Sequence, residues 1–193
     1  MKVVGINGSP RKDGNTAILI QTVFAELNAA GIETELIQLS GRNLKGCTAC
    51  WKCMDLKNGR CIMADDFFNE CLEKMIAADG IILGSPVYSA GVTSQMKALI
   101  DRASIVLAAN KGLLRRKAGA AVTAVRRGGA ISAFDTMTHF LHSKEMFLVG
   151  STYWNMGYGK DIGDVEKDQE GMANMKNLGQ NMAWLLQKIH SQA

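Results

Sequence analysis

Four cysteines stand close together in one stretch of the chain. Cys47, Cys50, Cys53 and Cys61 form the pattern C-x2-C-x2-C-x7-C. Cysteine thiolates are the usual ligands of iron–sulfur clusters, and the short spacings let one loop wrap three sulfurs around cluster corners. The fourth sulfur would return through a turn at Asn58-Gly59. These four residues are the full ligand set for a [4Fe-4S] cluster.

Two other interpretations of the cysteines are weighed against the cluster. Zinc also accepts four thiolates, but structural zinc sites usually have paired C-x2-C knuckles with a longer gap, which fits this spacing less well. Cys71 lies ten residues after Cys61 and is interpreted as a buried structural thiol, so it is left out of the ligand set. The long final gap makes Cys61 the weakest of the four assignments.

A polar segment follows the first apolar run of the chain. The sequence INGSPRKDGNT, residues 6–16, lies between a strand-like and a helix-like pattern. Free N–H groups at a helix start bind anions, and the side chains that could add donors are those of Ser9, Arg11, Asn15 and Thr16. A Walker loop would need Lys in place of Asn15, and a dinucleotide fingerprint would need G-x-G-x-x-G. Two interpretations of the segment remain, a binding site for a single terminal phosphate and a simple polar turn.

Two further segments follow later strand-like runs. Residues 84–89 read GSPVYS, in which Pro86 restricts the backbone of Ser85 and Tyr88 offers a planar face to a flat ring. Residues 123–129 read TAVRRGG, in which two glycines allow close approach of the backbone. Ligands of open parallel sheets bind at the carboxyl ends of the strands. We therefore expect these two segments to meet the Ser9 segment around one ligand.

The apolar periodicity supplies the elements that would position these residues. Strands are expected at residues 2–7, 34–39, 80–85, 118–124 and 146–150. Helices are expected at residues 16–30, 66–78, 93–107, 130–143 and about 168–190. This alternation predicts an α/β fold with a doubly wound parallel sheet of five strands and helices on both faces. The order 2-1-3-4-5, which is the flavodoxin-like one of the two common orders for such sheets, is the one expected here. The irregular stretches 40–65 and 151–167 are long enough to be functional.

The motifs together resemble a known family. G-S-P-R-x-x-G-N-T, S-P-V-Y and QMKALIDR at residues 95–102 are similar to the flavodoxin-fold NAD(P)H-dependent FMN reductase superfamily over nearly the whole chain. The resemblance implies that Ser9, Arg11, Asn15 and Thr16 hold the FMN phosphate. It also implies that the isoalloxazine ring lies along residues of the two later segments, namely Ser85, Pro86, Val87, Tyr88, Ser89, Thr123, Gly128 and Gly129, with Arg126 or Arg127 adding positive charge.

The cysteine pattern resembles the iron–sulfur flavoprotein branch of that superfamily. The implied function is electron transfer from a reduced donor through FMN and a [4Fe-4S] cluster, with NAD(P)H as a transient co-substrate and a small molecule or redox protein such as ferredoxin as partner. The chemistry would belong to the flavin, so no catalytic side chain is expected. The alternatives are a cluster-free quinone, flavin or azo reductase with a loop of reduced thiols, and a flavodoxin-like carrier.

Composition limits the remaining possibilities. The chain has 193 residues, 47% of them hydrophobic, and a net charge of +4, which favours one domain over residues 1–193 and gives no basic stripe for nucleic acid. No apolar run is long enough to cross a membrane, and a cytoplasmic homodimer or homotetramer is expected. His139 and His142 are interpreted as a helix-surface pair and Asp65-Asp66 as a negative helix start. The aromatic loop 150–159 would cover the flavin or form a subunit contact.

Overall fold

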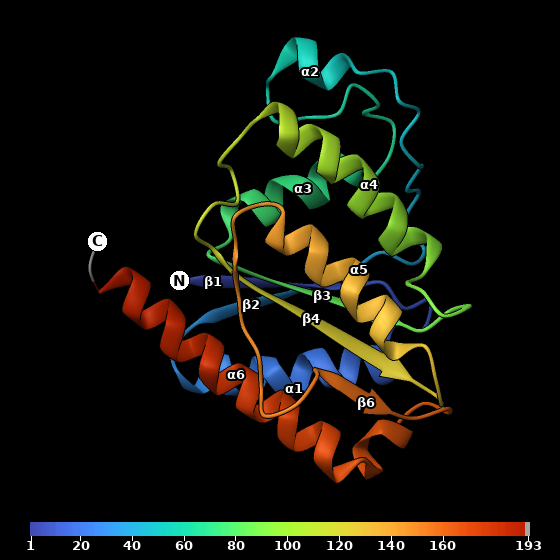
Figure 1. Ribbon diagram of the computed structural model, residues 1–193, viewed down its shortest axis with the longest axis vertical. Helices are drawn as coiled ribbons and strands as arrows, with labels where there is room; N and C mark the ends of the chain where they lie inside the picture. The colour runs from blue at the N-terminus through green and yellow to red at the C-terminus, as the bar shows by residue number, and fades with distance from the viewer. Residues whose placement is uncertain (192–193) are drawn as a thin grey trace.

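The computed structural model describes residues 1–191 and shows a parallel sheet with helices on both faces (Figure 1). The central strands are β1 (Lys2–Asn7), β2 (Glu33–Gln38), β3 (Gly80–Pro86) and β4 (Ala118–Val125). They pair in the order β2-β1-β3-β4 and continue into a fifth position. This order confirms the predicted topology, and the fully buried residues of β4 account for its unbroken apolar sequence.

The fifth position of the sheet differs from the expectation of one strand over residues 146–150. Two short strands fill it, β5 (Phe147–Leu148) and β6 (Met156–Tyr158). β5 pairs with the first residues of β4, and β6 pairs in parallel with Thr123–Val125 at its end. β6 was missed because its Met-Gly-Tyr sequence, next to Asn155 and Gly159, reads as a loop.

Within residues 1–191, five long helices and two short ones complete the fold. They are α1 (Asn15–Ala29), α2 (Lys52–Leu56), α3 (Phe68–Ala77), α4 (Ser94–Ala109), α5 (Ala130–His142), η1 (Asp164–Lys167) and α6 (Gln169–His190). The five long helices match the predicted ones to within a few residues. The short helix α2, inside the cysteine stretch, was not predicted, because five residues are too few to show a helical period. No helix among residues 1–191 has the length and apolarity to cross a membrane.

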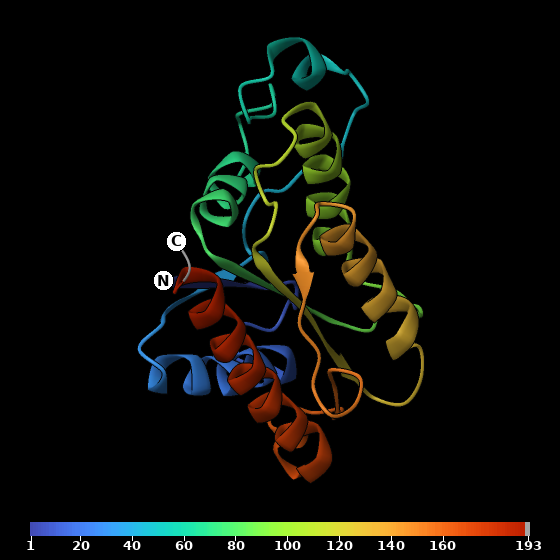
Figure 2. The same ribbon diagram turned by 60° about the vertical axis from the view of Figure 1, so that its left-hand side comes forward.

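Two apolar layers hold the helices against the sheet. One layer joins α1 and α6 to one face, and the other joins α3, α4 and α5 to the opposite face (Figure 2). α1 packs very closely against the sheet at Gly5. A Cβ at this position would come within 2.7 Å of side-chain atoms of Ile20 and Phe24, so the close packing depends on glycine there. α2 lies at one end of the long axis, beyond α4 and away from β6 (Figures 1 and 2).

Candidate functional site

Three loops at the carboxyl ends of the strands pack against one another. We call them the Ser9 loop (residues 8–14), the Tyr88 loop (87–93) and the Gly129 loop (126–129). The Gly8 N–H donates to the Gly84 carbonyl at 2.8 Å, and the Thr93 hydroxyl donates to the Gly8 carbonyl at 2.8 Å. One backbone bond and one side-chain bond therefore fix the Ser9 loop against the end of β3 and the start of α4.

A cavity of about 350 Å³ and another of about 230 Å³ contain most of the predicted site residues. The smaller one, the strand-end cavity, lies among the three loops. Of the residues predicted to bind cofactor, those that line it are Ser9, Arg11, Asn15, Thr16, Pro86, Val87, Tyr88 and Arg126. Ala124, Gly159 and Lys160 also line it and were not predicted. The structure thus brings segments from the first, third and fourth strands to one place.

Three predicted residues are wholly or mostly buried outside the lining of this cavity. Ser85 is fully buried, and its hydroxyl oxygen accepts the Thr93 N–H at 3.1 Å, which fixes the Tyr88 loop. Gly129 has φ of 84°, and a Cβ there would come within 2.9 Å of the Ala90 Cα. Thr123 is fully buried in β4, and its hydroxyl has no hydrogen-bond partner among residues 1–191.

Two predicted residues show no such constraint. Ser89 is exposed, with φ of 48°, at the tip of the Tyr88 loop. Gly128 is exposed, and a Cβ at that position would meet open space. Only the second glycine of the pair therefore needs to be glycine for steric reasons.

The start of α1 has the properties of an anion site. Its N-cap, Gly14, makes no side-chain cap, and the first turn of the helix carries no acidic residue. The free N–H groups and the helix dipole therefore favour a negative group there. Thr16, only 1% exposed, has a hydroxyl without a partner in the described part of the chain. Arg11, Arg126 and Lys160 add positive charge around the same cavity.

The Asn15 side chain, besides lining the strand-end cavity, makes contacts that were not predicted. Its Nδ2 donates to the Asp161 carbonyl at 3.0 Å, and its Oδ1 accepts the Gly163 N–H at 3.0 Å. Asn15 thus holds residues 159–163, the Lys160 loop, against α1, and Arg11 Nη1 reinforces this by donating to the Lys160 carbonyl at 3.2 Å. Sequence reasoning missed Lys160 because no local pattern links it to a residue about 150 positions earlier.

The larger cavity is the cysteine cavity. Its lining includes all four predicted ligands, Cys47, Cys50, Cys53 and Cys61, and also Met63 and Arg102. It shares no lining residue with the strand-end cavity. The four sulfurs do not lie in the geometry of a metal site in this structure. Within residues 1–191, no group of three His, Cys, Asp or Glu residues has metal-binding geometry.

The backbone between the first three cysteines contains two left-handed residues. Ala49 and Trp51 have φ of 51° and 60°, and alternation with left-handed residues forms the N–H concavities found at many iron–sulfur sites. The Ala49 N–H donates to Cys47 Sγ at 3.4 Å. The Lys52 N–H, the largest influence on Cys50, lowers the pKa of that thiol. Burial instead raises the pKa of Cys53.

Cys61 is held more firmly than its distance from the other cysteines suggested. Asn69 of α3 brackets its backbone, because Oδ1 accepts the Cys61 N–H at 2.8 Å and Nδ2 donates to the Cys61 carbonyl at 2.9 Å. Cys71, in the same helix, is fully buried outside the cavity lining, and burial raises the pKa of its thiol to about 12. A thiol with that pKa stays protonated near neutral pH and is a poor metal ligand.

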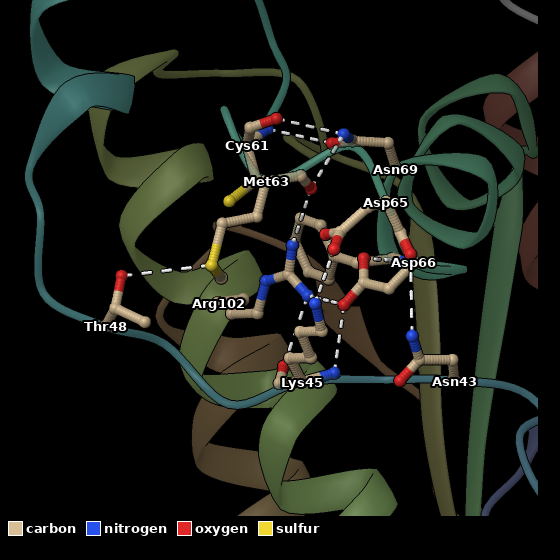
Figure 3. Close-up of polar contacts among 10 residues, drawn as sticks. Asn43, Lys45, Thr48, Cys61, Met63, Asp65, Asp66, Asn69 and Arg102 are labelled. Carbon is tan, nitrogen blue, oxygen red and sulfur yellow. Dashed lines mark hydrogen bonds and ion pairs between the residues drawn. The ribbon is translucent and has the colours of Figure 1, made fainter.

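The remaining sequence interpretations concern charged and imidazole side chains. His139 and His142 are exposed on α5, which agrees with a surface pair. Asp66 Oδ1 accepts the Phe68 N–H at 3.2 Å at the start of α3, as expected for a negative helix start. Asp66 also pairs with Arg102, and both side chains are buried (Figure 3). Burial opposes its ionisation, but hydrogen bonds led by that from Arg102 hold its pKa below the usual value.

Comparison with known proteins decides the family. The model of the NADPH-dependent FMN reductase family matches residues 1–161. The chain belongs to this family. An iron–sulfur flavoprotein of Methanocaldococcus jannaschii is 39% identical over 196 aligned residues, covering 98% of this chain and 99% of the relative. An iron–sulfur flavoprotein of Methanosarcina thermophila is 33% identical to this chain, and the alignment covers 98% of this chain and 97% of the relative.

These relatives place this FMN reductase family member in the iron–sulfur flavoprotein branch, as the motifs suggested. It is an FMN reductase-like oxidoreductase. Solved structures of lower identity support the fold. RosB superposes with a TM-score of 0.77 at 17% identity, covering 99% of this chain and 81% of RosB. A flavodoxin from the domain Archaea superposes with a TM-score of 0.62 at 14% identity, covering 97% of each chain.

Proposed function

We propose that this protein takes electrons from a reduced donor at FMN and passes them on through a [4Fe-4S] cluster held by Cys47, Cys50, Cys53 and Cys61. One observation carries the proposal beyond family membership. All four cysteines line a single cavity, although the last of them follows the others by a turn and a short helix. Four thiols and no histidine in one lining favour iron and sulfide over harder metals.

The strand-end cavity would hold FMN. Its phosphate would lie at the start of α1, where the helix N–H groups and the unpartnered Thr16 hydroxyl can donate to it. Arg11 and Lys160 would balance its charge, while Asn15 keeps the Lys160 loop in place. The isoalloxazine ring would lie along Pro86, Val87 and Tyr88, and Arg126 belongs to the same cavity lining.

The chain's own residues contribute binding and orientation to the reaction. FMN, when bound, supplies hydride and single-electron chemistry, so no acid or base from the protein is required. Tyr88 is 52% exposed beside the cavity, which leaves room for a nicotinamide to approach a ring lying against it. Arg126 or Arg127 would place positive charge near a reduced, anionic flavin and so favour it.

The electron donor, the acceptor and the assembly state belong to the same proposal. NADPH is the donor that the family name supports, and NADH is the alternative. A redox protein such as ferredoxin, or a small molecule, would receive single electrons. The half-exposed Tyr153 and Trp154 side chains suit a contact between copies in a homodimer or homotetramer.

Anaerobic reconstitution with iron and sulfide, followed by metal analysis, tests the cluster. We expect about four irons per chain and one FMN, with an electron paramagnetic resonance signal on reduction. Cys50→Ser should lose the iron and keep the FMN. Cys71→Ser is the matched control, because its thiol lies outside the cavity, and it should keep both.

The other outcomes identify the rival functions. A wild-type chain that binds FMN and oxidises NADPH without iron would be a cluster-free reductase. Bound FMN with no oxidation of NADPH or NADH would indicate a carrier. One zinc per chain, retained after anaerobic reconstitution with iron, would replace the cluster by a structural metal site.

A further inference from the structure

A buried arginine lies in the lining of the cysteine cavity. The Arg102 side chain, in α4, is 1% exposed, and that of its partner Asp66 is 0% exposed. The motif QMKALIDR that ends at Arg102 was noted for family resemblance, but neither the fold of the sheet nor FMN binding uses this residue. Arginine is rarely buried this completely unless its donors are engaged.

The contacts of Arg102 converge on the two ends of the cysteine segment, residues 47–61. Its Nη1 donates to the Lys45 carbonyl at 3.1 Å and its Nη2 to the Met63 carbonyl at 3.0 Å (Figure 3). Lys45 lies two residues before the first cysteine, and Met63 lies two residues after the last. One guanidinium therefore joins the entrance of the segment to its exit.

The guanidinium itself is held rigidly. Asp66 pairs with Nη1 and also accepts the Lys45 N–H at 2.9 Å. The ring of Phe68 lies 4.1 Å from Arg102 Cζ. A planar fork fixed in this way sets the directions of both carbonyl bonds, and a lysine ammonium could not reproduce that geometry.

One donor of Arg102 is left over. Its Nε–H is buried and has no acceptor among residues 1–191, and Arg102 is one of the residues that line the cysteine cavity. A buried N–H without a partner costs free energy unless a bound group supplies the acceptor. Thiolate and sulfide sulfurs of a cluster are hydrogen-bond acceptors, and such bonds tune cluster potentials.

We propose that Arg102, held by Asp66, is a positioning residue for the iron–sulfur site. It closes the cysteine segment over the cavity and gives its Nε–H to a cysteine sulfur of the assembled cluster. This inference rests on the proposed function. It predicts slower loss of iron and a higher reduction potential than the same cluster would have without Arg102, because the hydrogen bond stabilises the more negative, reduced state.

Arg102→Lys in the reconstituted, FMN-loaded protein is the test, with Arg115→Lys as matched control. Arg115 pairs with Glu145 on the surface, where both side chains are more than half exposed. We expect Arg102→Lys to release iron to a chelator about 10- to 100-fold faster and to shift the cluster midpoint potential to a more negative value. FMN affinity and the FMN potential should not change, and Arg115→Lys should match wild type throughout.

A second variant tests the same inference in case Arg102→Lys folds poorly. Asp66→Asn combined with Arg102→Gln removes both charges together, so no buried ion is left alone, and it should show the same faster iron release. Unchanged iron release and potential in a folded variant would overturn the inference. Parallel loss of iron, FMN and stability would also overturn it, because that result indicates a general structural role.

The iron-free protein separates this inference from the proposed function. The alkylation rates of Cys53 and Cys61, measured by mass spectrometry, should rise in Arg102→Lys as the segment opens, while that of Cys71 stays unchanged. Equal rates in wild type and variant would show that Arg102 does not close the segment. A wild-type chain that takes up no iron would instead refute the cluster, whatever the alkylation rates.

Discussion

The strand-end cavity and the cysteine cavity are built in different ways. Loops that leave neighbouring strands form the first, and backbone bonds from Gly8 N–H to Gly84 O and from Val87 N–H to Ala124 O tie two of those loops to the ends of β3 and β4. The long connection between β2 and α3 forms much of the second. Side chains hold this connection in place, chiefly those of Arg102, Asp66 and Asn69. The sheet supplies backbone bonds that support the first cavity beside side chains such as Thr93 and Asn15, whereas the second depends chiefly on a few side chains.

The largest effect on this contrast is expected from Asp66→Ala. It leaves the Arg102 charge buried without a counter-ion, because both side chains are inaccessible to water. Removing one partner of such a pair typically costs about 3–5 kcal/mol. Urea unfolding should report this loss of stability. In the same variant, iron binding should be abolished, whereas the strand-end cavity should keep its shape. Loss of less than about 1 kcal/mol, the size of a surface pair, would contradict the described burial.

The same pair gives a pH dependence with a defined sign. The pKa of Asp66 is lowered in the folded protein, so the unfolded chain binds its proton more readily. The stabilisation is therefore complete above the unfolded pKa of about 4 and is lost as pH falls through the lower folded pKa. Unfolding free energies of wild type should fall across this acid range more steeply than those of Asp66→Asn.

A smaller effect is expected at the strand-end cavity from Gly129→Val. Its φ of 84° and the 2.9 Å approach of a Cβ to the Ala90 Cα force strain or displacement of the Tyr88 loop. Strain of this kind costs about 1–3 kcal/mol, measurable by urea unfolding, and FMN affinity should fall with it. Gly128→Val is the matched control and should change both quantities little, because a Cβ there meets open space.

Thr16→Val should affect ligand binding more than folding. The Thr16 hydroxyl is buried without a partner in the described residues, so its loss costs the empty protein little. A hydrogen bond to a charged group contributes about 1.5–3 kcal/mol, so FMN titration should show clearly weaker binding. Thr138→Val removes another unpartnered hydroxyl, from α5, and should leave FMN affinity unchanged. Equal effects of the two variants would refute the assigned phosphate position.

The smallest effect is expected from Lys97→Gln, which provides a baseline on the same helix as Arg102. Lys97 pairs with Asp101 at 2.7 Å, and about half of each side chain is exposed. Pairs of this type contribute about 0.3–0.5 kcal/mol and are screened by salt. Urea unfolding at low and high salt should show a difference only at low salt.

Most of the fold follows from local patterns in the sequence. The buried strands β3 and β4 are nearly continuous apolar runs, and the long helices have clear periodicity, so the alternation of strands and helices could be predicted. β6 could not, because its three residues pair only in the context of the finished β4 edge. Likewise α2 lies in a loop whose shape depends on contacts with α4.

The sites divide along the same line. The positions of Ser9, Pro86 and Tyr88 were predictable because each lies at the end of a strand or two residues beyond it, where parallel sheets present ligands. Lys160 and Arg102 act across long sequence separations, and no local pattern distinguishes them from ordinary charged residues. Asn15 shows the converse case, in which a residue is placed correctly but its side chain is used to hold another loop.

The divided fifth strand also bears on how the molecule behaves in a crowded solution. Exposed strand edges attract foreign strands when they offer a long, regular row of free N–H and C=O groups. Here one border of the sheet is broken into pieces of two and three residues, and the opposite border, β2, carries Glu33 and Glu35 paired with Lys2. The short strands at one border offer too few free backbone groups to pair with a foreign strand, and the charged side chains on β2 oppose pairing at the other. Self-association through sheet extension is therefore disfavoured at both borders.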